Sequence, residues 1–395
     1  GQEWEPPATL PQLLRDAGYH TGLVGRNMHL HPHRKRYGFE EMVVAGRFDN
    51  DCSDYDEYLN RRLPEGGGYH GSGVMNNDWT ARTWHMPEHL HQTHWTVNEA
   101  LRFLRRRDPA RPWFLAVSFL APHPPLVPPE FYFNRYLRAD LPEPLLGAWA
   151  EKPEFPGGAP HVNSNRVDLQ GEVLRSCRAA YYALINHIDD EMRRLLSSEM
   201  RTYDARNTLV VFTSDHGEML GDHYFFRKSL PYEGAARIPF LIRMPGQWEN
   251  AARGAVSDLP VCLEDLMPTL LDAAGVEIPD HLDGRSLLPV LRGEEPASWR
   301  EALHVEHSGG EYGFHALTDG REKYIWFSRS GREQYFDLQT DPDELHDLSA
   351  LPAHRETMAA WRAQLVERLA GRPEGFVQNG RLIAGQTHTP LIPAT

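Results

Sequence analysis

Asp215 and His216 are the clearest candidates for metal ligands in this sequence, because they stand side by side directly after the apolar run 209–212. A carboxylate and an imidazole at the end of a strand are two of the ligand types that divalent cations take in proteins. Gly217 follows them and allows the chain to turn sharply. The motif over residues 213–223 therefore predicts a metal site. The alternative is a strand-end turn in which Asp215 caps a helix.

Two cations, Arg227 and Lys228, follow in front of a turn that contains a proline. Lysine offers a compact charge for one oxygen and arginine offers a planar fork, so this pair could bind an anionic group. Taken by themselves, the two residues are more typical of a solvated basic dipeptide.

His123 lies between Pro122 and Pro124, just beyond the apolar stretch 113–120. Prolines on both sides restrict the backbone and hold the imidazole in place. A histidine held in this way can protonate a leaving oxygen or donate a hydrogen bond to an anion. The alternative is a structural histidine in a proline-rich loop.

Residues 25–33 gather one arginine and three histidines after another short apolar stretch: Arg26, His29, His31 and His33. This density of hydrogen-bond donors suits a substrate rich in anionic oxygens. The alternative is a basic surface loop, which the charged run 34–36 favours.

Short apolar stretches that alternate with helical periodicity surround these four segments. Strands are predicted over residues 21–24, 113–120, 208–213 and 238–242, and helices after Thr9 and over residues 96–107, 172–200 and 263–274. The alternation predicts an α/β fold with a mostly parallel sheet covered by helices on both faces. Ligands of such sheets lie beyond the carboxyl ends of the strands, so we expect the four segments to converge at one edge.

The pattern changes after residue 300. Strands are predicted over residues 302–307, 313–318, 323–328 and 333–338, followed by a helix over 351–369. This order predicts a small antiparallel sheet with one helix. We therefore divide the chain into an α/β catalytic domain at residues 1–295 and a C-terminal α+β subdomain at residues 296–395.

The composition narrows the class of protein. The chain has 395 residues, of which 41% are hydrophobic and 24% charged, and this is typical of a globular protein. Its formal net charge of −14 argues against a nucleic-acid partner. There is no run of eighteen apolar residues, so no membrane span is predicted. The 3 cysteines, Cys52, Cys177 and Cys262, form neither a disulfide framework nor a CxxC zinc motif.

Together these motifs resemble the sulfatase family of the alkaline phosphatase superfamily. The resemblance covers nearly the whole chain. It rests on the helix and strand over residues 9–25, the histidine loop 121–125, the motif 213–223 with its following lysine, and the C-terminal pattern over 335–344. The form of the motif, Asp-His followed by Gly-Glu-Met-Leu-Gly-Asp-His, is similar to that of bacterial members.

The resemblance implies hydrolysis of a sulfate ester, such as that of a sulfated glycan or small molecule. Family members use a formylglycine nucleophile and a bound Ca²⁺ or other divalent cation. Asp215 and His216 would be metal ligands, while Arg26, His123 and Lys228 would bind substrate and act in catalysis. His29 would be a further catalytic residue. Arg26 stands where the family usually has lysine, and it would act as a fixed charge because arginine does not readily lose its proton.

The family's first strand and its Cys/Ser-x-Pro-x-Arg nucleophile motif are not present in this sequence. We expect an upstream segment to supply them, and we expect this chain alone to be inactive. Two alternatives stay open: a phosphonate monoester or phosphodiester hydrolase of the same superfamily, and a catalytically silent anion-binding homologue. A homo-oligomer and either a bacterial periplasmic or cytoplasmic location are also compatible with the sequence.

The stretch 77–95 is rich in tryptophan and histidine. Tryptophan faces stack well on sugar rings, so this stretch predicts a sugar pocket. The alternative is an aromatic-rich packed insertion.

Overall fold

Three parallel strands lie at the centre of the first part of the chain, in the order β2-β1-β3. The computed structural model describes residues 5–27, 32, 34–46, 53–63, 68–154, 160–198, 205–296, 298–308 and 312–388. The three strands are β1 (His20–Arg26), β2 (Glu41–Ala45) and β3 (Trp113–Ser118). The predicted parallel sheet is therefore confirmed, with β2 as a strand that the sequence pattern did not predict.

The two remaining predicted strands of this part pair with each other. They are β4 (Val210–Thr213) and β5 (Phe240–Arg243), and they run antiparallel. The mostly parallel architecture thus carries one antiparallel pair among the residues that the structure describes.

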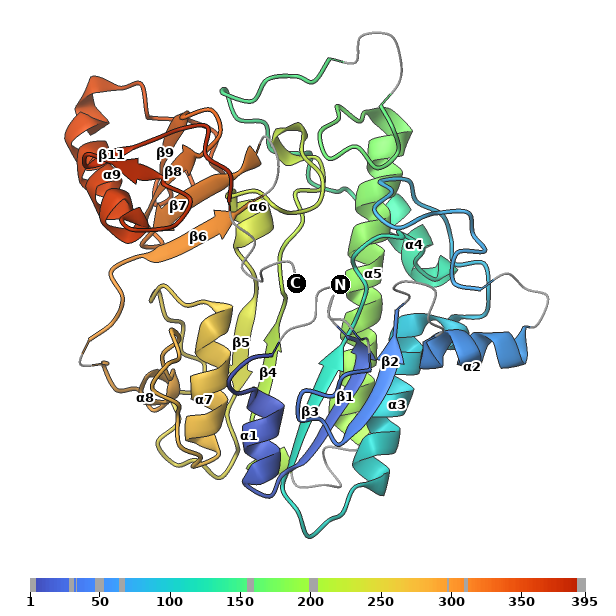
Figure 1. The fold of residues 1–395 in the computed structure, drawn as a ribbon. Coiled ribbons are helices and arrows are strands. Elements are labelled where there is room, and N and C mark those ends of the chain that lie inside the picture. Colours follow the sequence, from blue (N-terminus) through green and yellow to red (C-terminus); the bar gives the residue numbers. More distant parts are fainter. Residues whose placement is uncertain are drawn as a thin grey trace.

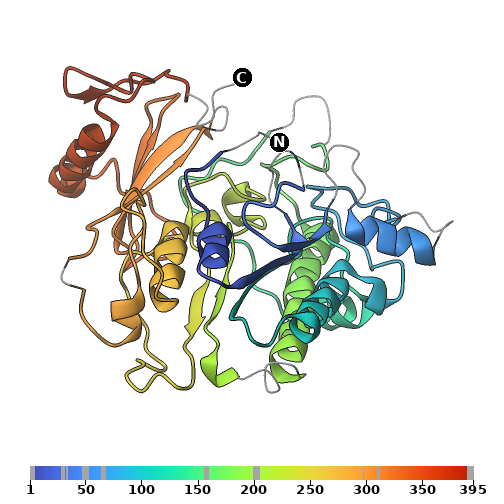
Figure 2. The ribbon, with the colours of Figure 1, turned by 60° about the horizontal axis from the view of Figure 1, so that its bottom comes forward.

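Helices cover both faces of the strands (Figures 1 and 2). On one side lie α3 (Gln92–Arg106) and α5 (Gly171–Ser198), and on the other lie α1 (Leu10–Asp16) and α7 (Leu266–Ala273). The apolar residues of α3 recur at helical spacing, and they pack with Leu195 of α5 against β3. The predicted helices and their placement on both faces are confirmed.

The strand β3 is less buried than its apolar sequence predicts. Every residue of Trp113–Ser118 is only partly buried. In the described sheet β3 is an edge strand, paired with β1 alone. Trp113, Leu115 and Val117 contact the α3 cluster, so one face of the strand is covered while its edge is open.

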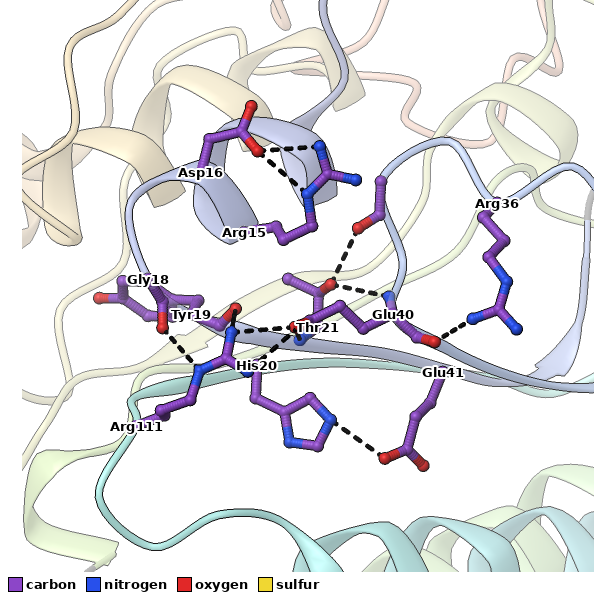
Figure 3. Close-up of polar contacts among 11 residues, drawn as sticks. Arg15, Asp16, Gly18, Tyr19, His20, Thr21, Arg36, Glu40, Glu41 and Arg111 are labelled. Carbon is purple, nitrogen blue, oxygen red and sulfur yellow. Dashed lines mark hydrogen bonds and ion pairs between the residues drawn. The ribbon is translucent and has the colours of Figure 1, made fainter.

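The amino-terminal ends of β1 and β2 are held by Arg111, which lies just before β3 (Figure 3). Its guanidinium donates hydrogen bonds to the carbonyls of Gly18 and Tyr19 at 3.1 and 2.7 Å. It also donates to both carboxylate oxygens of Glu40, at 3.2 and 3.1 Å. The Thr21 amide donates to the same carboxylate at 3.0 Å. This polar network fixes the ends of the strands opposite to those that lead to the candidate site.

The C-terminal part forms the predicted antiparallel sheet, in the order β6-β7-β8-β9. Its strands are β6 (Leu303–His307), β7 (Phe314–Thr318), β8 (Glu322–Phe327) and β9 (Glu333–Asp337). One face packs on α9 (Arg355–Leu369). The other face shares a hydrophobic cluster with Met219, Phe225, Leu230, Tyr232 and Ala235. The C-terminal sheet therefore supports the segment that carries the predicted metal motif.

Shorter elements connect these parts. They are α2 (Asp54–Arg62), α4 (Glu130–Leu137), α6 (Glu233–Ala236), α8 (Leu288–Leu291), a small hairpin of β10 (Val377–Gln378) and β11 (Arg381–Leu382), and the 3-10 turns Glu88–Leu90, Ala205–Asn207, Asp222–Tyr224, Leu263–Asp265 and Pro352–His354. None of the described helices combines the length and the apolar character that a membrane span requires.

Candidate active site

The loop after β4 presents Asp215 and His216 together. The His216 amide donates to Asp215 Oδ1 at 3.1 Å, and His216 Nε2 lies 3.6 Å from Asp215 Oδ2. His216 Nδ1 lies 2.8 Å from the Gly217 carbonyl. A carbonyl only accepts hydrogen bonds, so Nδ1 carries a proton, and Nε2 is the ring nitrogen that could ligate a cation. With 41% of the Asp215 side chain and 26% of the His216 side chain exposed, both reach solvent and could bind a cation.

Gly217 holds this loop against α6. Its amide donates to the Ala235 carbonyl at 2.8 Å. A Cβ atom at this position would lie 2.2 Å from the Gly234 carbonyl oxygen. The close approach of the two backbone segments therefore requires glycine, which is the physical reason for its place after Asp215 and His216.

His123 and Lys228 meet directly, although 105 positions separate them in the chain. Lys228 Nζ lies 2.7 Å from His123 Nε2, and His123 Nδ1 lies 2.8 Å from the Pro124 carbonyl. Because that carbonyl requires a proton on Nδ1, Nε2 accepts its hydrogen bond from the Lys228 ammonium. Burial, together with the neighbouring Lys228 charge, lowers the pKa of His123 to about 4. The imidazole is therefore neutral near pH 7.

Arg26 joins the same group from the end of β1. It is buried, with 8% of its surface exposed. Burial lowers the pKa of Arg26, and the nearby Asp215 carboxylate opposes this shift. The Arg26 charge also acts on His123 and on Lys228. Residues at the end of β1 and after β3 and β4 thus converge as predicted, whereas His29 lies outside the described residues.

Glu218 is a member of this group to which the sequence motif assigned no role. One of its carboxylate oxygens accepts the amides of Leu220, at 3.0 Å, and Arg227. Burial raises the pKa of Glu218, and the Glu218 charge opposes the lowering of the Lys228 pKa by burial. The only signal in the sequence was a carboxylate placed within the motif. Its charge acts on Lys228 because the loop folds back on itself.

Arg227 and Lys228 do different things, so the expectation that the pair binds one anion is wrong for Arg227. Its guanidinium donates to the backbone carbonyls of Asn77, at 2.7 Å, and Asn163. The backbone at Arg227 has a φ of 68°. This left-handed geometry turns the chain between the two neighbours, so that Arg227 ties two loops together while Lys228 faces His123.

The end of the motif is structural. Asp222 Oδ1 accepts the Leu145 amide at 3.0 Å, and His223 Nδ1 accepts the Gly147 amide at 3.0 Å. His223 is buried with 3% of its surface exposed, and burial lowers its pKa to about 4. These two side chains attach the proline-rich segment to the loop.

The tryptophan-rich stretch is packed rather than presented to a ligand. Trp84 and Trp95 have only 4% and 2% of their surfaces exposed. Both belong to hydrophobic clusters, and Trp79 packs partly buried against a third. A sugar ring cannot reach the faces of Trp84 or Trp95, so the predicted stacking surface is wrong for these two residues.

Two cysteines are described, and both are free thiols. Cys177 is buried with 1% exposed, and burial raises its pKa. Burial also raises the pKa of Cys262 to about 12. A nucleophilic cysteine requires a lowered pKa, so neither side chain suits that role. Cys52 lies outside the described residues.

The ligand set around Asp215 fits a divalent cation in part. Asp215 supplies oxygen and His216 supplies nitrogen, but Ca²⁺ takes about six to eight ligands, all of them oxygen. Among the described residues, no third His, Cys, Asp or Glu joins this pair to form a cluster with ligand spacing. Asp215 is thus the ligand that suits a hard cation.

Comparison with known proteins decides the family. A family model described as sulfatase matches residues 1–276, and a model of the C-terminal part of N-sulphoglucosamine sulphohydrolase matches residues 221–371. An arylsulfatase of Clostridium perfringens is 39% identical over 98% of this chain and 82% of its own length. The chain belongs to the sulfatase family. It is a hydrolase of sulfuric esters.

Further similarity agrees with this membership of the sulfatase family. A choline-sulfatase of Rhizobium meliloti is 30% identical over 90% of this chain and 70% of its own length. The crystal structure of a phosphonate monoester hydrolase of Agrobacterium radiobacter superimposes with a TM-score of 0.75 and 26% identity. It covers 92% of this chain and 81% of that one. The fold of this sulfatase is therefore alkaline phosphatase-like.

Proposed function

We propose that this sulfatase hydrolyses the sulfate ester of a carbohydrate or a related small molecule, with Arg26, His123 and Lys228 around the sulfate group. The observation that carries the proposal is the contact of 2.7 Å between Lys228 Nζ and His123 Nε2. It brings a cation and a neutral imidazole together next to the buried charge of Arg26. Preorganised donors of this kind stabilise the charge that develops on the oxygens of a transferred group.

A formylglycine hydrate, the group that sulfatases use, would supply the nucleophile, and we propose that the divalent cation is Ca²⁺. Asp215 and His216 would hold this cation from the loop after β4. Water and oxygens of the sulfate group would supply further ligands to it. The hard oxygen of Asp215 supports Ca²⁺, and the imidazole of His216 also suits softer divalent cations.

The proton for the leaving oxygen starts on Lys228. Its ammonium has three hydrogens, of which His123 Nε2 accepts one. The other two remain for oxygens of the sulfate ester. The neutral His123 orients the ammonium, because Pro124 fixes its tautomer. As the ester bond breaks, Lys228 gives a proton to the departing oxygen, directly or through His123.

A second candidate is phosphonate monoester hydrolysis. It is favoured by the structural similarity, at a TM-score of 0.75, to the phosphonate monoester hydrolase of Agrobacterium radiobacter. The cations Arg26 and Lys228 bind oxygens of sulfate and phosphonate alike, so the described residues do not separate the two substrates. The relative rates of hydrolysis of the two substrates distinguish them.

The test is a substrate comparison with protein expressed from its gene together with a formylglycine-generating enzyme. We expect a higher kcat/KM for 4-nitrophenyl sulfate than for 4-nitrophenyl phenylphosphonate. We expect Lys228→Ala and His123→Ala to lower the hydrolysis of an alkyl sulfate by about 100- to 10,000-fold, the usual contribution of general acid catalysis. The loss should be smaller for the nitrophenyl ester, whose leaving group needs no proton.

Measuring the bound metal in each variant distinguishes the role of Asp215 from that of His123. Asp215→Ala should lose both bound metal and turnover, whereas His123→Ala should keep the metal and lose turnover. Normal turnover in either variant would refute the assigned site. A preference for the phosphonate would replace the first candidate by the second.

A further inference from the structure

A second cluster of ligand-type side chains lies in the C-terminal sheet, outside the site described above. His304 and Glu306 alternate along β6 and therefore share one face of the sheet. His315 on β7 is the cross-strand partner of Glu306. One ligand atom from each of the three residues lies within 4.8 Å of the other two. The register of two adjacent strands thus brings two imidazoles and one carboxylate to a single point.

The closest distances in this cluster match those between ligands of a single ion. His315 Nδ1 lies 3.1 Å from His304 Nε2 and 3.1 Å from Glu306 Oε2. Ligand atoms about 2.0–2.1 Å from a tetrahedral Zn²⁺ lie about 3.3 Å from one another. The three side chains need only small adjustments to surround an ion of this size.

Hydrogen bonding alone leaves this arrangement poorly satisfied. His315 Nδ1 has at most one hydrogen, yet it faces both the imidazole nitrogen of His304 and the carboxylate of Glu306. If His315 Nδ1 donates its hydrogen to Glu306, His304 Nε2 still lies 3.1 Å from it and makes no good hydrogen bond there. A cation between the three atoms would turn all of them into ligands.

Two members of this cluster have lowered pKa values. Hydrogen bonds from His315 and Arg372, against opposing burial, lower the pKa of Glu306 to about 2. Burial lowers the pKa of His304 to about 4, and the neighbouring His315 adds to this shift. These groups are close enough to one another for each to change the pKa of its neighbour.

The cluster is open to solvent on one side and is surrounded by further side chains on the other. The Glu306 side chain is 31% exposed and opens the cluster to solvent, whereas His315 is fully buried. His388 stacks on His315 with a ring distance of 4.9 Å, and its Nε2 is buried without a hydrogen-bond partner. Arg372 contacts Glu306 Oε2 at 2.6 Å, so it shares the carboxylate with the cluster and competes with a cation for its charge.

We propose that His304, Glu306 and His315 bind a divalent transition-metal ion of the zinc class, separately from the Asp215 site. Two imidazoles and one carboxylate are ligands that Zn²⁺ takes, and Ca²⁺ and Mg²⁺ prefer all-oxygen sites. The ion would link β6 to β7 across their paired residues. The inference does not depend on the substrate of the enzyme.

The test is isothermal titration of Zn²⁺ into chelator-treated protein that carries Asp215→Ala and His216→Ala, which removes the ligands of the other site. We expect one Zn²⁺ per chain and no comparable binding of Ca²⁺. Adding His304→Ala or Glu306→Gln should weaken Zn²⁺ by at least about 10-fold, a loss that even changes outside the ligand sphere can reach. His346→Ala, which removes an exposed histidine paired with Asp341, is the matched control and should change nothing.

Arg372→Gln should not weaken the binding of Zn²⁺, in contrast to the two ligand variants. It removes the cation that competes for Glu306, so Zn²⁺ should bind as tightly as before or more tightly. Circular dichroism of each variant establishes that the chain is folded. The proposal is overturned if folded protein binds no Zn²⁺, if His304→Ala and Glu306→Gln bind it as well as the control, or if Arg372→Gln abolishes binding.

Discussion

At the scale of single residues, the state of His123 depends on its neighbour. Lys228 donates a hydrogen bond to His123 Nε2 and places a positive charge 2.7 Å away. If the His123 imidazole were protonated, its Nε2–H would point at the Lys228 ammonium, which has no lone pair to accept a hydrogen bond. The pair therefore keeps its transferable proton on the lysine, and a bound sulfate ester would bring the negative charge that lets the proton move.

This argument predicts a measurable pKa change. In Lys228→Met the pKa of His123 should rise from about 4, because the nearby charge is lost. It should stay below the ordinary value near 6.5, because burial is the larger cause of the shift and remains. An NMR titration of the histidine ring signals, assigned with His123→Ala, measures it.

Lys152→Met is the matched control, because Lys152 is exposed and pairs with Asp168 rather than with His123. An unchanged His123 pKa in Lys228→Met would show that the 2.7 Å contact does not set the state of the imidazole.

At the scale of elements, the end of β1 is held by a backbone contact. Gly25 has a φ of 102°, and a Cβ at this position would lie 1.9 Å from the Ser118 carbonyl oxygen at the end of β3. This approach sets Arg26 next to the segment that leads to His123. Gly18 has a similar φ of 97°, but a Cβ there would meet no atom within 4 Å.

The two glycines form a controlled pair. Gly18→Ala should cost about 1–2 kcal/mol of unfolding free energy, the strain of a left-handed residue. Gly25→Ala adds a clash with backbone and should exceed about 4 kcal/mol, a loss that is exceptional for one substitution. Urea unfolding of both variants measures the difference. Equal losses of unfolding free energy in the two variants would mean that β1 and β3 can move apart at Gly25 without a loss of stability.

Periodicity made the long helices and the four C-terminal strands predictable, and it placed β1, β3 and β4 to within two residues at each end. It did not predict β2, which is defined by its pairing with β1. Nor could it separate Arg227 from Lys228, because a left-handed φ decides which way each side chain points. The burial of Trp84 and Trp95, and the meeting of His304 with His315, depend on tertiary packing and strand register.

At the scale of the whole molecule, buried neutral histidines make stability depend on pH. His187 is fully buried between His91 and Tyr132, with ring distances of 4.9 and 5.0 Å. Neither of its ring nitrogens has a hydrogen-bond partner. Burial lowers the pKa of His187 to about 4. In the unfolded chain the value is about 6.5, so the unfolded state binds more protons between these values.

The stability contributed by neutral His187 is therefore present above pH 6.5 and lost as the pH falls toward 4. The loss approaches about 3 kcal/mol, from about 1.4 kcal/mol for each unit of pKa difference. His187→Phe should remove this part of the pH dependence, and His346→Phe at an exposed position should not. Urea unfolding at pH 7.5 and at pH 4.5 measures both. An unchanged slope in His187→Phe would contradict the prediction.

The hydrophobic cluster between the C-terminal sheet and the metal-motif loop limits how sulfatases of this kind can recombine. Lys323 of β8 adds an ion pair to Glu233 across the same contact at 2.7 Å, and it also pairs with Glu344 of the C-terminal part at 2.8 Å. A chimera that takes its C-terminal sheet from another sulfatase would set foreign side chains against Met219 and Tyr232. Exchange of substrate preference by swapping whole segments should therefore succeed when the crossover lies before residue 219, so that the loop travels with the sheet that it was selected to fit.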